Sequence, residues 1–182
     1  MKFISHPIIN GLIEIIPDVW KDERGYFFEA YHSEKWSKFG IPKTFLQDNQ
    51  SFSKKGTIRG LHFQKEPFEQ GKLVSVVKGK ALDVAVDIRP NSPTFGRHAK
   101  FILDCEQHNL VYIPPGFAHG FLALEDVIFV YKCTNVYNKT YESGLLWNDP
   151  DLEIDWGIKD PLISEKDKNL PKLVDLKNSL DV

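Results

Sequence analysis

Short apolar runs alternate with turn residues along most of the chain, from the N-terminus to about residue 148. Within several runs every second residue is apolar, which is the spacing of a β-strand with one buried face. Gly, Pro, Asn and Asp separate the runs. The pattern predicts strands at 11–17, 26–31, 72–77, 81–88, 101–103, 110–113, 119–124 and 127–133. No long helical period interrupts them, so the sequence predicts an all-β barrel or sandwich of the jelly-roll kind.

Helical signals are few and short, and they lie mainly near the C-terminus. Residues 33–39 predict one short helix, with Ser33 as its N-terminal cap and Gly40 as its stop. The strand pattern loosens after Trp147, and Ser164 begins a second short helix. We therefore expect one jelly-roll domain over residues 1–182, in which 150–182 is an extension packed on the barrel.

The most polar strand-like stretch lies at 47–64 and carries amides, a guanidinium, an imidazole and a central glycine. A regular strand would point Arg59 and His62 to opposite sides. Gly60 lies between them, and glycine inside a strand often marks a bulge, which would bring both side chains to one side. A base beside an anion-binding arginine would suit a substrate site. The same residues also fit a polar barrel rim with a hydrogen-bonded histidine.

The segments 72–77 and 81–88 form a predicted hairpin around Lys78-Gly79-Lys80. One face of its second arm carries large apolar residues, and the other carries alanines with Asp83 and Asp87. A small, acidic face suits a cavity if it points inward and suits water if it points outward. The sequence leaves these two alternatives open.

Composition excludes several function classes. The 182 residues are 42% hydrophobic with a net charge of −2, so we expect a folded chain that does not bind nucleic acid nonspecifically. No apolar run approaches the roughly 20 residues that span a membrane, and the first residues are too poor in apolar side chains for a signal peptide. Cys105 and Cys133 lie on separate apolar segments and are interpreted as reduced core thiols of a cytoplasmic protein.

Metal and nucleophilic chemistry find little support in the residue spacing. None of the six histidines is separated from another by a single residue, so no strand offers two imidazoles to one ion. His62 and His119 could converge, but without a clear third and fourth ligand they make a poor metal site. There is no Gly-x-Ser-x-Gly elbow, no P-loop and no Gly-x-Gly-x-x-Gly. We expect neither a metal nor a nucleotide cofactor.

Acid–base chemistry remains. His62 can take up a proton near neutral pH, and a carboxylate usually orients such a base. Asp167 and Asp83 are both candidates for that carboxylate. Asp167 has a second interpretation, because Ser164-x-x-Asp167 resembles a helix capping box with Asp in place of Glu.

Other polar residues also have two interpretations each. Tyr131 could act as a phenolic acid or pack in the core. Lys72, which opens a strand after a glycine, could hold an oxyanion in a pocket or protect an exposed sheet edge. Arg24 and Arg59 could clamp phosphates or form surface ion pairs, and Tyr137 could stack on a nucleobase or cover the core.

Taken together, the motifs resemble those of the dTDP-4-dehydrorhamnose 3,5-epimerase family along nearly the whole chain. The matching segments are Asp22 to Glu29, Gln47 to Ser51, Arg59 to Gln64, Gly71 to Val74, Asp87 to Arg89, Ile113 to Phe121, Leu146 to Pro150 and Ser164 to Asp167. The set is specific, although no single segment would suffice.

The resemblance implies a cupin-type jelly roll that forms a homodimer with exchange of an N-terminal strand. It implies cofactor-free epimerisation at C3 and C5 of dTDP-4-keto-6-deoxy-D-glucose, giving dTDP-4-keto-L-rhamnose on the way to dTDP-L-rhamnose. By resemblance, His62 paired with Asp167 is the base, Tyr131 the acid, and Lys72 the donor to the keto oxygen. The implied substrate contacts are Arg24, Glu29, Gln47, Asp48, Asn49, Arg59, Lys72, His119, Glu142 and Lys166, with Tyr137 stacking on thymine.

Three alternatives stay open beside this hypothesis: an epimerase acting at C3 or C5 alone, a non-catalytic sugar-nucleotide binding module, and a metal-dependent cupin. The sequence does not fix the final sugar or the strictness for dTDP. The residue types do fit the double reaction. Protons at C3 and C5 are acidic because the C4 ketone accepts charge as an enolate, and inversion requires one group on each face of the ring.

Overall fold

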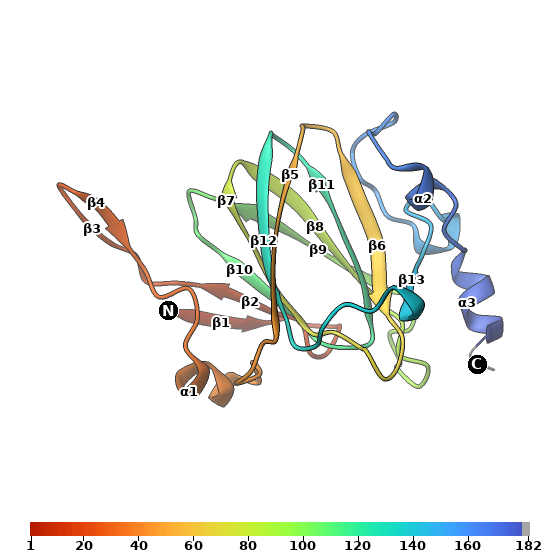
Figure 1. Cartoon of the computed structure of the whole chain (residues 1–182), viewed down its shortest axis with the longest axis horizontal. Helices are drawn as coiled ribbons and strands as arrows, with labels where there is room; N and C mark the ends of the chain where they lie inside the picture. Colours follow the sequence, from red (N-terminus) through yellow and green to blue (C-terminus); the bar gives the residue numbers. More distant parts are fainter. Residues whose placement is uncertain (180–182) are drawn as a thin grey trace.

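Two antiparallel sheets face each other in the computed structural model, which describes residues 1–179 (Figure 1). The larger sheet has the strand order β1 (Lys2–Ser5), β2 (Ile13–Ile16), β10 (Leu110–Ile113), β7 (Lys72–Lys78), β12 (Val127–Cys133) and β5 (Gln47–Ser53). The smaller has the order β13 (Glu142–Gly144), β6 (Ile58–Gln64), β11 (Phe117–Ala123), β8 (Lys80–Asp87) and β9 (His98–Asp104). The predicted jelly roll is confirmed. Of the two forms left open by the sequence it is the sandwich, because no strand pairing among residues 1–179 joins the two sheets.

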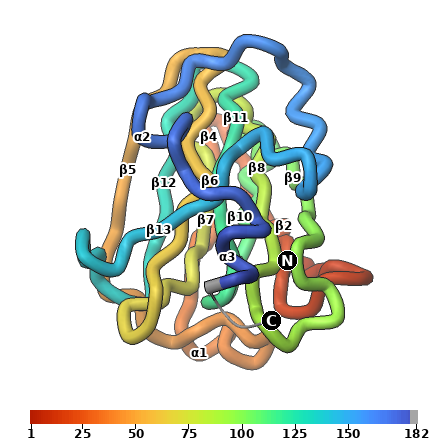
Figure 2. Tube along the Cα trace, turned by 90° about the vertical axis from the view of Figure 1, so that its right-hand side faces the viewer, coloured from red at the N-terminus to blue at the C-terminus, as the bar shows by residue number. Residues whose placement is uncertain are grey.

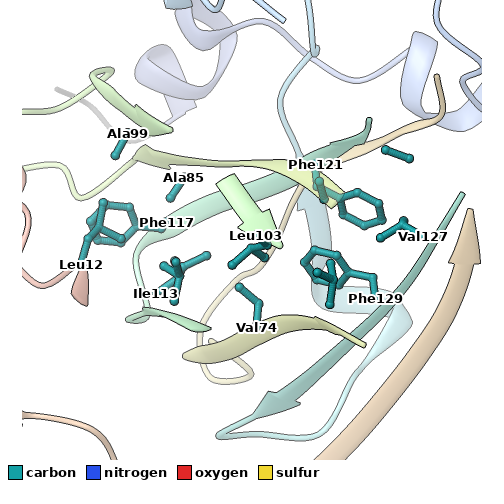
Figure 3. Packing of buried hydrophobic residues seen from close by; sticks show 14 of the residues in the cluster. Leu12, Val74, Ala85, Ala99, Leu103, Ile113, Phe117, Phe121, Val127 and Phe129 are labelled. Carbon is teal, nitrogen blue, oxygen red and sulfur yellow. The ribbon is translucent and has the colours of Figure 1, made fainter. Parts of the chain in front are cut away.

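The space between the sheets is filled by the main apolar core, which Figure 3 shows from close by. Val74 and Phe129 point into it from the larger sheet, and Leu103 and Phe121 from the smaller. Strand alternation explains this set, since every second side chain faces the opposite sheet.

The acidic face of β8 is the inner one, which resolves the alternatives left open by the sequence. Ala81 and Ala85 belong to the core between the sheets, and Asp83 and Asp87 are both completely buried. The other face of β8 is buried as well, because Val84 and Val86 pack under the C-terminal segment. A strand with two buried faces has to place its carboxylates among partners rather than in water.

The C-terminal segment covers the outer face of the smaller sheet, as the blue part of the trace shows in Figure 2. Leu152, Trp156 and Leu176 pack there against Ile58 and Leu122. The segment contains η3 (Pro150–Leu152), α2 (Glu165–Lys168) and α3 (Leu173–Ser179). This packing brings α2 beside β6. The end of the predicted extension, residues 180–182, lies outside the described residues.

Part of the outer face of the larger sheet is covered by α1 (Ser33–Trp36) and η1 (Ser37–Phe39), with Trp36 wholly buried in a cluster with Ile15 and Leu73. Gly40 ends this helical stretch with a positive φ of 86°, as predicted. The predicted Ser33 cap is wrong by one residue. The side chain of His32 accepts the hydrogen bond from the Lys35 amide, because Ser33 already lies inside the first turn.

A two-stranded hairpin, β3 (Trp20–Asp22) and β4 (Gly25–Phe27), projects away from the two sheets (Figure 1). The predicted strand 26–31 therefore ends early, at Phe27. Trp20, Tyr26 and Phe27 are 57%, 60% and 69% exposed, so the hairpin presents aromatic side chains to its surroundings. Within residues 1–179 no helix is long and apolar enough to cross a bilayer.

Candidate active site

Two adjoining cavities open between the sheets, with volumes of about 620 and 240 Å³. His62, Lys72 and Tyr131 line both of them, so one continuous site runs past these three side chains. Among the residues expected at the site, the larger cavity adds Arg59, His119, Lys166 and Asp167, and the smaller adds Gln47, Asn49, Tyr137 and Glu142. Most of the expected residues therefore gather in one place.

The predicted bulge in β6 is confirmed. His119 pairs with His62 and Phe121 pairs with Arg59, so β6 carries one more residue than β11 between these two pairs. Gly60 has φ 131°, and a Cβ there would lie 2.5 Å from the Cα of Gly120. The close approach of two glycines thus allows the extra residue, and both Arg59 and His62 line the larger cavity.

Asp167 is the carboxylate partner of His62, with 2.7 Å between Oδ1 and Nε2. Its Oδ2 accepts a hydrogen bond from the Gly60 amide at 3.2 Å. The capping interpretation also holds, because the Asp167 amide donates to Ser164 Oγ at 3.1 Å. Burial would raise the pKa of the Asp167 carboxyl, but the hydrogen bonds from His62 and Gly60 outweigh it and lower that pKa. The carboxylate is therefore ionised when the imidazole takes up a proton.

Asp83, the other candidate partner, bonds a different histidine. Its Oδ1 lies 2.6 Å from Nε2 of His119, and both side chains are buried. Burial is the largest effect on His119 and lowers its pKa, although the Asp83 carboxylate opposes that shift. Because His62 and His119 are paired across β6 and β11, two histidine–aspartate pairs lie side by side.

Lys72 is not the edge lysine of the alternative interpretation. It lies on β7, between β10 and β12, and is buried. Its Nζ donates to the His62 carbonyl oxygen at 3.3 Å. Burial lowers the pKa of the Lys72 ammonium, and the nearby Cys133, Asp83 and Glu142 act in the opposite direction. A positive group in a desolvated pocket is well suited to stabilise an oxyanion.

Tyr131 faces the cavity from β12, beside Phe129 on the same strand face. Burial raises the pKa of its phenol, so the hydroxyl keeps its proton at neutral pH. Its position satisfies both interpretations of the sequence, since the ring packs on the core while the side chain lines the site.

The remaining polar groups lie around the opening. Glu142 accepts a hydrogen bond from the Tyr137 hydroxyl at 2.9 Å and pairs with Lys166 Nζ at 2.5 Å. Gln47 accepts from the Tyr137 amide at 2.7 Å and donates to Asn49 at 2.9 Å. These contacts hold the loop that carries Tyr137 against β5.

The Arg59 guanidinium is held by neutral groups rather than by a carboxylate. Nε donates to Ser53 Oγ at 2.9 Å, and another nitrogen donates to the Phe52 carbonyl at 3.1 Å. Its positive charge is therefore oriented toward the cavity without a compensating acid among residues 1–179.

Three expected contacts line neither of these two adjoining cavities. Arg24 lies on the projecting hairpin and pairs with Asp22, and Glu29 pairs with Lys35. Asp48 lies on the outer face of β5, where it pairs with Lys132 at 2.8 Å. Successive side chains of a strand point to opposite faces, and Gln47 and Asn49 take the inner one, so the Asp48 side chain points away from these two cavities and its substrate contact stays a prediction.

Metal-ligand geometry is absent from residues 1–179, where no three His, Cys, Asp or Glu side chains are grouped to hold an ion. His62 and His119 each bond a carboxylate instead. Cys105 and Cys133 are free thiols.

The comparisons with known proteins agree with this geometry. A family profile described as dTDP-4-dehydrorhamnose 3,5-epimerase matches residues 7–175. The chain belongs to this family. It is 48% identical over 177 residues to the dTDP-4-dehydrorhamnose 3,5-epimerase of Shigella flexneri, which covers 96% of this chain and 97% of the relative.

Two solved structures with different named activities are both similar to this chain. An enzyme of Legionella pneumophila in complex with dTDP-4-keto-L-rhamnose is 42% identical, with a TM-score of 0.90 over 96% of both chains. ChmJ, a 3'-monoepimerase from Streptomyces bikiniensis in complex with dTDP-quinovose, is 34% identical, with a TM-score of 0.89 over 97% of this chain and 90% of that one. The fold is shared by both, so it does not by itself fix how many carbons react.

Sequence reasoning missed some residues of the epimerase site. Ser53, which holds Arg59, and the stacked pair Phe121 and Phe129 in the cavity wall were not expected there. Strand alternation could have found the two phenylalanines, because each lies two residues from an expected site residue, His119 or Tyr131.

Proposed function

We propose that this chain epimerises C3 and C5 of dTDP-4-keto-6-deoxy-D-glucose without a cofactor, giving dTDP-4-keto-L-rhamnose for dTDP-L-rhamnose biosynthesis. One observation carries the proposal. A histidine–carboxylate pair, a buried ammonium and a protonated phenol all line one cavity, at His62, Lys72 and Tyr131. The family membership and the product bound by the Legionella relative support the same reaction.

His62 acts as the base in this proposal. It removes the proton from a carbon next to the ketone, and the Asp167 carboxylate, 2.7 Å away, stabilises the imidazolium that forms. Asp167 is itself fixed by the Gly60 amide and by the Ser164 cap. The orientation of the base therefore depends on the packing of α2 against β6.

Lys72 acts on the ketone oxygen. Charge develops there as the enolate forms, and a donor placed in a water-poor site contributes on the order of 3 kcal/mol to the transition state. The buried position of Lys72 between the two sheets supplies such a site.

Tyr131 returns the proton at C5. It reaches the cavity from β12, on the larger sheet, whereas His62 reaches it from β6, on the smaller sheet. Groups on opposite sheets can address opposite faces of a flat enolate, and that arrangement is what inversion needs.

The nucleotide lies toward the opening in this proposal. Arg59 and Lys166 bind the diphosphate as cations, and Tyr137 stacks on thymine. Gln47, Asn49, His119 and Glu142 supply hydrogen bonds to the substrate. Binding of the remote nucleotide keeps the small sugar aligned for both proton transfers.

A homodimer completes the site in this proposal, with exchange of an N-terminal strand. Arg24 lies on a hairpin that leaves its own body and exposes three aromatic side chains, and Glu29 follows that hairpin closely in the sequence. Such a surface suits a second copy of the chain. We infer that Arg24 and Glu29 reach the cavity of the partner.

Mixing two inactive variants tests the shared site. Arg24→Ala and His62→Ala proteins are each expected to have low activity, whereas their unfolded and jointly refolded mixture should recover about one quarter of wild-type activity, because half of the dimers then hold one intact site. A mixture no more active than its components would contradict a shared site. Light scattering of each variant provides the control for dimer formation.

The reaction itself is tested by turnover in D₂O followed by NMR. Deuterium should enter at both C3 and C5 of the product, and His62→Ala should abolish exchange at both carbons. Label at one carbon only would favour the alternative activity of the ChmJ type, a single-position epimerase.

Full turnover by His62→Ala would instead favour a binding module without catalysis. The free cysteines agree with a reducing compartment, and a cytoplasmic location remains part of the proposal.

A further inference from the structure

Two carboxylates are completely buried on the inner face of β8, Asp83 and Asp87. Asp87 is fully satisfied, since it accepts hydrogen bonds from Arg89, Ser92 and Thr94. Asp83 is not. Its Oδ1 accepts from His119, but its buried Oδ2 has no hydrogen-bond partner among residues 1–179. A buried polar atom without a partner is costly, and natural proteins retain few of them without a reason.

The surroundings of Asp83 point to that reason. Its charge acts on the buried ammonium of Lys72, which has only one hydrogen bond in the described chain, to the His62 carbonyl. Burial lowers the pKa of Lys72, and a neutral amine would not stabilise an enolate oxygen. Lys72 is also faced by Cys133 on β12, Glu142 on β13, and His119 on β11.

We propose that Asp83 is a positioning residue for the epimerase reaction, which binds Nε2 of His119 and supplies the buried counter-charge for the Lys72 ammonium beside the substrate's ketone oxygen. This rests on the proposed function. The 2.6 Å bond to the carboxylate selects the His119 tautomer with its proton on Nε2. A neutral His119 then adds no second positive charge that would repel Lys72. No other donor among residues 1–179 bonds Oδ2 of Asp83, so the negative charge of this carboxylate remains available to the Lys72 ammonium.

Asp87 provides a matched control for the experiment. Both aspartates lie on the same strand face and are equally buried, but the Asp87 network lies outside the two cavities next to the site. Replacing either with Asn keeps the size of the side chain and removes its charge. A general loss of stability should therefore appear in both variants, and an effect on Lys72 only in Asp83→Asn.

The measurement is kcat and KM of the full-length enzyme between pH 6 and 10, with dTDP affinity as a binding check. In Asp83→Asn we expect the alkaline fall of kcat to begin at a pH about 1 to 3 units lower than in wild type, because a nearby opposite charge shifts a pKa by about that much. KM and dTDP affinity should change less than about twofold, a difference well below 1 kcal/mol. Asp87→Asn should keep the wild-type limb. Superimposable profiles for Asp83→Asn and wild type, or equal shifts in both variants, would refute the proposal.

A titration of the wild-type chain covers the case in which Asp83→Asn does not fold. The ¹³Cε signal of Lys72, assigned by its loss in Lys72→Met, should report a charged amine at neutral pH, and Asp83→Glu should retain that charge. A neutral Lys72 at pH 7 in the wild type would overturn the proposal. The titration needs no turnover, so it distinguishes failure of this proposal from failure of the proposed reaction.

Discussion

Replacing Asp167 with Asn tests the central contact of the site with little change in shape. The amide oxygen can still accept at the position of Oδ1, 2.7 Å from His62 Nε2, but the NH2 group that replaces Oδ2 would face the Gly60 N–H, so that hydrogen bond is lost. What disappears is the negative charge that faces the imidazolium after proton abstraction. The variant therefore keeps the size of the side chain and the Ser164 cap, and it removes the charge together with the Gly60 hydrogen bond.

The size of the effect follows from the geometry of that contact. A separation of 2.7 Å is at the short end for a charge-assisted N–H···O bond. Hydrogen bonds to charged groups contribute about 1.5 to 3 kcal/mol, which corresponds to a loss of about 10- to 150-fold in kcat. KM should change little, because the imidazolium exists only after proton transfer begins.

Steady-state kinetics with the 4-keto substrate between pH 6 and 9 provides the assay. The hydrogen bonds at Asp167 lower its pKa below the ordinary value, so its charge is present throughout that range and would be lost only in more acidic solution. The loss of kcat should accordingly be independent of pH.

Asp149→Asn is a suitable control, since Asp149 is also buried in the C-terminal segment, and within residues 1–179 its side chain bonds only the Asp151 and Leu173 amides. It should lower stability and leave kcat unchanged. If Asp167→Asn turned over within about twofold of wild type, less than 1 kcal/mol, the carboxylate would have no role in the base.

Three further results are expected. Tyr131→Phe should still exchange deuterium at C3 but lose the C5 product, as NMR in D₂O would show, and label at both carbons would contradict its role as the acid. Burial would raise the pKa of Asp87, but its three side-chain donors lower it to about 2, so wild type should lose about 2 kcal/mol of stability as pH falls from 4 to 2. Urea unfolding of Asp87→Asn should show no such loss of stability between pH 4 and pH 2, and at pH 7 this variant should be about 2 kcal/mol less stable than wild type. An equal loss of stability in both proteins as the pH falls would refute this. Gly120→Ala should lose about 1 to 3 kcal/mol in urea unfolding, because its Cβ would lie 2.6 Å from the Arg59 carbonyl, and wild-type stability would disprove the need for glycine.

The sequence predicted most strands because alternation is a local signal. β10 and β12 were predicted with the bounds that the structure has, and the β7–β8 hairpin within one residue at each end. The first strand, β1, was not predicted, because it is mostly exposed and is held by its pairing with β2 rather than marked by an alternating pattern of its own. The choice between barrel and sandwich was left open for a related reason, since strand pairing between sheets is a property of the whole fold.

Partner choice among polar residues could not be read from spacing. The packing of α2 on β6 assigns Asp167 to His62, and the pairing of β8 with β11 assigns Asp83 to His119; neither follows from spacing in the sequence. The match to a contiguous motif also does not show which way each of its side chains points, as Asp48 illustrates. The three polar residues at 47–49 match the family together, yet strand alternation sends the middle one to the outer face.

The buried charges of the site fit one another once the reaction is considered step by step. Before proton transfer, Lys72 is balanced by Asp83, while Asp167 faces a neutral imidazole. Abstraction of the proton creates an imidazolium beside Asp167 and an enolate beside Lys72. Each new charge therefore forms next to a fixed charge of opposite sign, so the site need not reorganise in order to stabilise it. Removing either aspartate leaves one of these two charges without its partner, and the two variants should differ in a predictable way: Asp167→Asn lowers kcat at every pH, whereas Asp83→Asn lowers it mainly in alkaline solution.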